Sequence, residues 1–304
     1  MTHLARRPAL LTFALALAAA VPRPAGAADL DHDGLDDALE DALLVRHAPV
    51  VLLHPSEPVK PSSAEWLLAR AQIEPPGRAP RVLAASVLGL LASFAAGPAE
   101  DPAARLRADP AALSGDAESR DWAVYGHAYR AAGGGVLLQY WFLYPFNAAY
   151  GAFDHGGDWE HVTVRLGPDL RPEGAHLARH ADSAPGPWFA WAALERDGDH
   201  PVIRAGRGTH ASYASPQDAP FWDRVCGAPD LASAPAAGCT AWRTWTGGGV
   251  VNVGERSFPR VGFLAWPGRW GTTGSWGGDS ASAPPPGPAF QDGWCPGGAQ
   301  GACP

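Results

Sequence analysis

The feature that most limits the possible folds of this chain is one long apolar stretch, GVLLQYWFLYPF, at residues 135–146. Apolar side chains occupy both alternating sets of positions in it, which predicts a central β-strand with both faces buried. Further runs of aromatic and β-branched residues are bounded by turn-forming glycine and aspartate. These runs lie at 123–129, 160–166, 188–194 and 201–205. The sequence therefore favours a mainly β fold, an antiparallel β-sandwich with helices near its N-terminus.

The beginning of the chain has the three parts of a secretory signal peptide. A basic start (MTHLARR) leads into an apolar run (PALLTFALALAAAV), and small residues precede the expected cleavage point after Ala27. We therefore expect residues 1–27 to be a signal peptide and the mature chain to be secreted or periplasmic. The other long apolar run, at 82–96, is shorter than the roughly 20 residues of a membrane-spanning helix. No transmembrane segment is expected in the mature chain.

Composition divides the rest of the chain into an acidic segment and one larger domain. We expect the acidic segment, at 28–41, to precede a single β-sandwich domain that covers 46–304. A stretch rich in Ala, Pro and Asp predicts a helical insert near 73–120. Sequence rich in Gly and Pro after residue 247 predicts long C-terminal loops.

The net charge excludes one class of partner. The chain carries 23 Lys and Arg against 31 Asp and Glu, a net charge of −8. Loss of residues 1–27 would remove Arg6, Arg7 and Arg23 and no acidic residue, which makes the net charge −11. An acidic surface repels phosphate backbones, so we expect no nucleic acid partner, whereas metal cations are favoured.

The cysteines all lie in the last third of the chain, and in an exported protein their even number predicts two disulfide bonds. They are Cys226, Cys239, Cys295 and Cys303. Three pairings are possible. We favour Cys226–Cys239 and Cys295–Cys303, because each of these pairs closes a short loop rich in Gly, Pro and Ala.

The acidic segment contains DLDHDGLDDALE at residues 29–40, whose oxygen donors follow the spacing of a calcium loop. The predicted calcium ligands are the side chains of Asp29, Asp31, Asp33, Asp37 and Glu40 and the backbone carbonyl of Leu35. Gly34 permits the sharp bend that such a loop needs. Asp36 stands where an EF-hand has an aliphatic residue, so the pattern is more similar to the loops of thrombospondin type 3-like repeats. We expect weak calcium binding; the alternative is a solvated acidic segment that binds nothing tightly.

A second group of candidate ligands lies in HGGDWEH, at residues 155–161. In a strand, Asp158 and Glu160 share one face and His161 points to the other. The two glycines allow His155 to approach the same side, and two close carboxylates repel unless a cation or a proton lies between them. The spacing thus predicts a second divalent cation; the alternative is that one carboxylate binds turn amides and the other faces water. His210 is a possible additional ligand or base.

Several blocks, in order, resemble the vacuolar protein sorting-associated protein 62 family. They are APVVLLHPSEPVKPSSAEWLL (48–68), LQYWFLYPFN (138–147), HGGDWEHVTVRL (155–166), HPVIRAGRGTHASYAS (200–215) and NVGERSFPRVGFLAWPGRWG (252–271). This resemblance covers most of residues 46–290, although 73–120 fit it poorly. The family's name implies a role in sorting.

HGGDWEH also has a more distant similarity to the heptapeptide of the necrosis- and ethylene-inducing-peptide-like proteins, which are secreted β-sandwich cytolysins. In that family the first His, the Asp and the Glu hold a divalent cation, together with an Asp from the preceding strand. The resemblance assigns the cation to His155, Asp158 and Glu160, with Asn147 in place of the strand Asp. The mixed ligand set leaves the identity of this second cation open.

We weigh three classes of function. The first is a secreted, metal-dependent surface-binding or toxin-like protein, for which exposed Trp residues suit glycans or membrane headgroups as partners. The second is a metal-dependent hydrolase that uses the cation at His155, Asp158 and Glu160. The third is a structural extracellular calcium-binding domain. A non-enzyme is favoured, because the motifs of common hydrolases are missing from the sequence.

Overall fold

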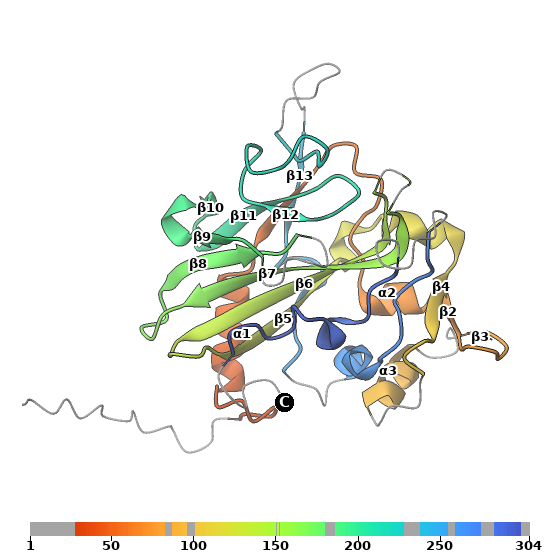
Figure 1. Cartoon of the computed structure of the whole chain (residues 1–304). Coiled ribbons are helices and arrows are strands. Elements are labelled where there is room, and N and C mark those ends of the chain that lie inside the picture. The colour runs from red at the N-terminus through yellow and green to blue at the C-terminus, as the bar shows by residue number, and fades with distance from the viewer. Residues whose placement is uncertain are drawn as a thin grey trace, which may run out of the picture.

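Three sheets and a few short helices make up the structure, a computed structural model of the chain (Figure 1). It describes residues 28–82, 87–95, 101–149, 151, 153–179, 186–227, 238–254, 259–274 and 283–298. The expected signal peptide lies outside these ranges. Within them most strand pairs are antiparallel, which confirms the prediction of a mainly β fold. No helix in the described ranges is long and apolar enough to cross a membrane.

The largest sheet has its strands in the order β14-β5-β6-β7-β8-β9. They are β5 (Ala123–Arg130), β6 (Val136–Asn147), β7 (His155–Leu166), β8 (Pro172–Leu177), β9 (Trp188–Ala190) and β14 (Gly249–Asn252). The three strands β5, β6 and β7 pair in antiparallel register, with Phe142 opposite Glu160. Strand β14 lies at one edge and pairs with β5 in parallel.

The second sheet has the order β10-β11-β1-β13, with β12 paired to β11. Its strands are β1 (Val50–Leu53), β10 (Arg196–Asp197), β11 (His200–Ala205), β12 (Ser212–Tyr213) and β13 (Thr240–Arg243). Strands β1 and β11 run parallel although they are far apart in the chain. The segments that follow these two strands therefore leave the sheet at the same end, and this brings residues 54–60 close to residues 206–210.

The main hydrophobic core lies between the two large sheets, where residues of β1, β11 and β13 meet those of β5 to β8. Strand β6 contributes Tyr140 and Phe142 to this core. Its alternate residues Trp141 and Leu143 belong to a second core on the opposite face. All four side chains are at most 1% exposed. The prediction that residues 135–146 form a strand buried on both faces is confirmed.

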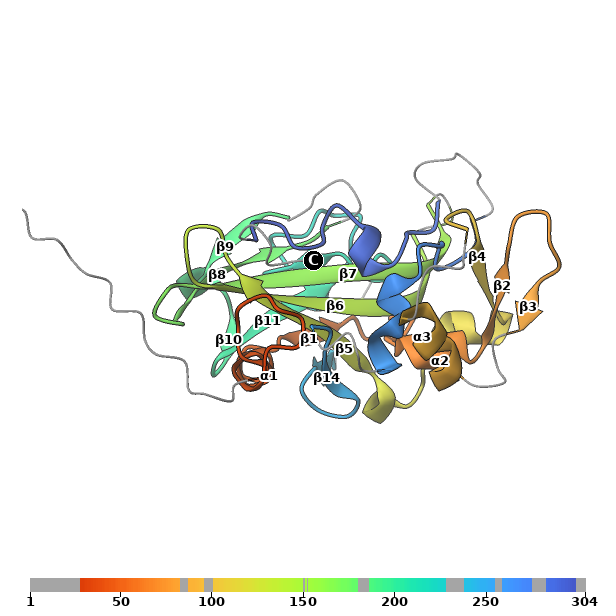
Figure 2. The same cartoon turned by 90° about the horizontal axis from the view of Figure 1, so that it is seen from below.

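The opposite face of the largest sheet is covered by helices and by a small third sheet (Figure 2). The helices are α2 (Ala64–Leu68), α3 (Val87–Ala95) and the 3-10 helix η4 (Pro259–Ala265). The third sheet, in the order β3-β2-β4, is formed by β2 (Ala71–Glu74), β3 (Arg81–Val82) and β4 (Arg105–Ala108). The shorter 3-10 helices are η1 (Pro110–Ser114), η2 (Ser119–Asp121), η3 (Trp191–Ala193) and η5 (Pro288–Phe290).

The expected helical insert near 73–120 is mixed in structure where it is described. It contains one α-helix, α3, but also strands β3 and β4. Strand β2 lies in the middle of the third sheet and pairs in antiparallel with β3 on one side and with β4 on the other. Burial alternates along β4, with Leu106 buried between two exposed arginines, and this two-residue period favours a strand over a helix.

The predicted disulfide Cys226–Cys239 is confirmed. It joins the segment after β12 to the residue directly before β13. Cys295 is also disulfide-bonded, but its expected partner Cys303 lies outside the described residues.

Candidate metal centre

The N-terminal acidic loop lies against the edge of the largest sheet, directly before helix α1 (Asp37–Arg46). Helix α1 contacts both β5 and β14. Arg130, at the end of β5, donates hydrogen bonds from Nε (3.2 Å) and Nη2 to the carbonyl oxygen of Gly34. Gly34 has a φ of 91°, in the left-handed region that favours glycine, and so makes the bend that the sequence predicted.

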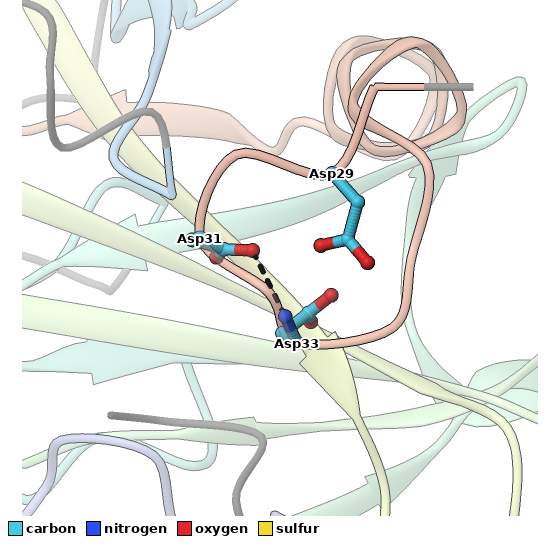
Figure 3. Close-up of side chains that lie close together, drawn as sticks. All are labelled: Asp29, Asp31 and Asp33. Carbon is cyan, nitrogen blue, oxygen red and sulfur yellow. Dashed lines mark hydrogen bonds between the residues drawn. The ribbon is translucent and has the colours of Figure 1, made fainter. Parts of the chain in front are cut away.

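Three acidic side chains of this loop converge on one point, as Figure 3 shows. One carboxylate oxygen from each of Asp29, Asp31 and Asp33 lies within 4.8 Å of the others. In the described part of the chain, no other group of three or more Asp, Glu, His or Cys side chains has its ligand atoms this close together. Asp31 Oδ1 accepts from the backbone N–H of Asp33 (3.2 Å), and Asp33 Oδ1 accepts from that of Leu35 (2.6 Å). These bonds hold both side chains by their Oδ1 atoms.

Two buried carboxylates at the loop each have an oxygen atom without a hydrogen-bond partner. They are Asp33, through Oδ2, and Glu40, through Oε1. The two residues are 7% and 1% exposed. Burial raises the pKa of Asp33 to about 6 and that of Glu40 to about 8, and the charge of Asp31 adds to both shifts. An unpaired buried anion is costly, and a cation placed between such carboxylates removes the cost.

The other two predicted ligands have defined positions in the loop. Asp37 Oδ1 accepts a hydrogen bond from the backbone N–H of Leu30 (3.0 Å), which closes the loop. At the equivalent position of a calcium loop the ion is often reached through a water molecule. The side chain of Leu35 is 3% exposed and belongs to the main core. This anchor fixes the backbone whose carbonyl was predicted to bind calcium.

The second predicted site lies at the start of β7. Asp158 and Glu160 share a face with the core residue Val162, as the two-residue period predicted. His161 lies on the opposite face, where its ring contacts Trp141 with 4.4 Å between the ring centroids. Asp158 and Glu160 are therefore directed toward the interior of the sandwich.

Asp158 and Glu57 lie on either side of the imidazole of His210. His210 Nδ1 is 2.7 Å from Asp158 Oδ2, and Nε2 is 3.4 Å from Glu57 Oε1. The His210 ring stacks on Tyr144, with 3.7 Å between the ring centroids. Burial alone would lower the pKa of His210, but Asp158 and Glu57 raise it to about 9. The imidazole therefore carries a positive charge at neutral pH.

Glu160 is a second buried acid of this region, 5% exposed. Burial, followed by the charges of Asp158 and Asp223, raises the pKa of Glu160 well above its ordinary value. Burial and these neighbouring charges therefore favour the protonated form of Glu160. The charge of His210, beside Asp158, reduces the expected repulsion between Asp158 and Glu160.

His155 and Asn147, which lie opposite each other in β7 and β6, bind each other. His155 Nδ1 donates to the carbonyl of Gly157 (2.8 Å), so its Nε2 accepts from Asn147 Nδ2 (3.1 Å). Asn147 Oδ1 is buried without a hydrogen-bond partner. The predicted ligands of the second cation do not form one cluster of ligand atoms within 4.8 Å in the described part of the chain. The second cation stays a prediction.

Sequence reasoning missed two residues that contact these sites. Glu57 belongs to a block that supported the family resemblance, but its contact with His210 depends on the parallel pairing of β1 and β11. Asn252, on β14, donates from Nδ2 to Glu40 Oε2 (3.1 Å). Neither contact has a local sequence signal, because each joins segments that are distant in the chain.

No family model and no curated protein matches the chain. The resemblance to the vacuolar protein sorting-associated protein 62 family therefore stays a prediction. Among solved structures, the chain is similar to "Necrosis and Ethylene inducing Protein 2 from the causal agent of cocoa's Witches Broom disease". The TM-score is 0.37 at 14% sequence identity, over 74% of this chain and 82% of that one. A similarity of this extent assigns neither fold nor function to the chain.

Proposed function

We propose that this chain is a calcium-dependent extracellular β-sandwich protein whose loop at residues 29–40 binds one calcium ion. The observation that carries the proposal is the pair of buried carboxylate oxygens of Asp33 and Glu40 that have no hydrogen-bond partner beside other acids of the loop. The disulfide Cys226–Cys239 supports an extracellular location, because such bonds persist in oxidising compartments.

The ligand set favours calcium over other divalent metals. The predicted donors are all oxygen atoms, which suits calcium and magnesium, whereas zinc prefers nitrogen and sulfur. Calcium accepts six to eight oxygens in irregular arrangements, whereas magnesium demands a near-ideal octahedron. A short loop of alternating aspartates meets the first requirement more easily. We expect a dissociation constant of about 10⁻⁴ to 10⁻³ M, as in extracellular modules.

The role of this calcium ion would be structural. The loop joins the beginning of the described chain to helix α1, and α1 packs on β5 and β14. The loop and helix α1 together are called the N-terminal unit. A cation that neutralises Asp33 and Glu40 would stabilise the packing of this unit on the sandwich. A ligand that binds only the folded chain stabilises it by about 2.7 kcal/mol at a hundredfold excess over its dissociation constant.

Calorimetric titration of the chain with calcium tests the proposal. We expect one binding event in the parent and none in the variant Asp31→Ala with Asp33→Ala. Asp41→Asn is the matched control, because Asp41 is an exposed acid next to Glu40 and outside the predicted ligand set. Equal calcium stoichiometry in the parent and the double variant would refute the proposal. Tighter binding of zinc than of calcium would refute the choice of metal.

The second cation, at the start of β7, is proposed as a separate and optional site. Its support is the unpartnered Oδ1 of Asn147 beside His155. The position of His210 argues against this cation, because its positively charged imidazole already contacts Asp158. A metal-dependent hydrolase would need this cation together with a water molecule, and Asp158 and Glu160 are 7% and 5% exposed. We therefore propose a binding protein in preference to an enzyme.

A surface-binding function is supported by exposed aromatic side chains at Phe221 and Trp222, and not by the tryptophans of the C-terminal segments. Trp242, Trp266 and Trp270 are at most 4% exposed, so these indoles fill the cores. Phe221 and Trp222 are instead 84% and 57% exposed, and their rings are in edge contact. A pocket of about 460 Å³ lies beside them, lined by Arg179, Tyr213, Gln217, Asp218, Ala219, Pro220 and Trp222.

An indole face beside hydroxyl, amide and carboxylate groups suits a glycan or a glycosylated headgroup. The Arg179 guanidinium already pairs with Asp218, so the pocket favours a neutral ligand over an anionic one. A glycan array and uncharged liposomes with and without glycolipid test this function. Binding that is lost in Trp222→Ala and kept in Trp188→Ala, whose indole is 43% exposed on β9, would support it. Leakage of the liposomes would support a toxin-like activity, and no binding to either probe would refute the surface-binding function.

A further inference from the structure

We propose that strand β14 and the residues directly after it form the second half of the calcium centre. In this arrangement Asn252 positions the carboxylate of Glu40, and Gly254 leaves the space that the carboxylate of Asp31 occupies. Calcium then holds helix α1 against the edge strand of the largest sheet. The inference rests on the proposed calcium binding, and it adds residues that lie outside the loop sequence.

Asn252 holds Glu40 through an amide group whose orientation is fixed. Its Oδ1 accepts a hydrogen bond from the backbone N–H of Gly254 (3.0 Å). Its Nδ2 must therefore face the other way, where it donates to Glu40 Oε2 (3.1 Å) and to Asp41 Oδ1 (3.1 Å). With Oε2 held in this way, Oε1 of Glu40 is the buried oxygen that has no hydrogen-bond partner. Asn252 thus positions the last predicted ligand of the loop.

Gly254 lies directly against the acidic centre. A Cβ atom at this position would be 2.8 Å from Asp31 Oδ2, 3.2 Å from Glu40 Oε2 and 3.3 Å from Asn252 Oδ1. These distances place oxygens of Asp31 and Glu40 around one small volume, although the two residues come from the loop and from α1. The backbone of Gly254 lies outside the left-handed region. The absence of a side chain is therefore needed for space and not for backbone conformation.

Further contacts fasten the same N-terminal unit to neighbouring strands. Arg130 of β5 donates to the Gly34 carbonyl, and Tyr140 of β6 donates from its hydroxyl to the Leu44 carbonyl (3.0 Å). Strand β14 itself is short and pairs with β5 on one side only. The calcium centre would then include a short edge strand of the sheet, so that calcium binding and the docking of β14 are linked.

Two explanations of calcium binding are thereby distinguished. If residues 29–40 bind calcium as a local loop, changes in β14 leave the calcium affinity unaltered. If β14 completes the centre, Asn252 acts on the metal through Glu40. Loss of a residue that orients a metal ligand typically weakens metal binding about 10- to 100-fold.

Calcium titrations of three single variants of the full chain test the inference. We expect Asn252→Ala and Gly254→Ala each to weaken calcium binding at least about tenfold while one site per chain remains. Asp41→Asn is the matched control, because it removes the charge of the other acceptor of Asn252 Nδ2 and leaves Glu40 in place. Its dissociation constant should stay within about twofold of the parent value.

Hydrogen exchange of the parent gives a second measurement that needs no variant. A hundredfold excess of calcium over its dissociation constant should slow exchange of the β14 amides at least about tenfold. Parent affinity in both Asn252→Ala and Gly254→Ala, or unchanged exchange of β14, would overturn the role of this strand and leave the loop as a local calcium site. Absence of calcium binding in the parent would instead overturn the proposed function itself.

Discussion

The N-terminal loop and the start of β7 both crowd acidic side chains together, but they neutralise them differently. At β7 the protein supplies its own counter-charge, because the imidazole of His210 lies between Asp158 and Glu57. At the loop, Asp33 and Glu40 keep buried oxygens without a hydrogen-bond partner. The guanidinium of Arg130 is near, but its hydrogen bonds go to the Gly34 carbonyl.

This difference shows that the spacing of acids alone does not tell whether a metal is needed. The loop predicted calcium from the spacing of its oxygen donors, and HGGDWEH predicted a cation from the repulsion between Asp158 and Glu160. The counter-charge at β7, His210, comes from a segment far away in the chain, so only the fold shows that it is present. A metal is expected where the fold leaves buried carboxylates unpaired.

The largest expected effect is at β7. His210→Gln leaves Asp158 and Glu57 buried without a cation, and breaking a buried ion pair in this way costs about 3–5 kcal/mol. Chemical denaturation should show this loss of stability equally with calcium and with chelator. His176→Gln, a change at a half-buried histidine of β8, is the control. A loss below about 1 kcal/mol would mean that His210 is not the counter-charge of this cluster.

The second prediction tests whether the stability of the chain depends on calcium at the loop and not on a metal at β7. Calcium at a hundredfold excess should stabilise the parent by about 2.7 kcal/mol, and chelator should remove this gain. The variant Asp31→Ala with Asp33→Ala should melt at one temperature under both conditions. If it remains sensitive to chelator, and a further Asp158→Asn change removes the sensitivity, then β7 also holds a cation and the contrast fails.

A smaller effect is expected from pH. The pKa values of Asp33 (about 6) and Glu40 (about 8) are raised in the calcium-free fold. The calcium-free chain therefore loses stability as pH rises from the ordinary carboxyl range to about 8. Calcium requires the deprotonated ligands, so its affinity should rise over the same range, by about tenfold or more between pH 5.5 and 8. Calorimetry at these two pH values checks this, and equal affinities would exclude both carboxyls as ligands.

Local pattern predicted much of the fold and part of the sites. The two-sided apolar run predicted the central strand β6, the two-residue period placed Asp158 and Glu160 on one face, and loop composition predicted Cys226–Cys239. These features depend on residues close together in the chain.

Contacts between distant segments could not be predicted in this way. The partner of His210 follows from the parallel pairing of β1 with β11, and the contact of Asn252 with Glu40 follows from the docking of β14. The exposed pair Phe221 and Trp222 was missed as well. Tryptophan content alone does not tell which indoles enter a core.

The central claim is that the loop carries buried negative charge that calcium neutralises, and Glu40→Gln tests it most directly. This change removes the charge and keeps the shape of the side chain. Stability should be measured at about pH 9, where Glu40 with its pKa of about 8 is ionised, by denaturation in chelator and in saturating calcium. The account predicts opposite signs: the variant is more stable than the parent without calcium and less stable with it. A variant that shifts stability in the same direction under both conditions would contradict the account.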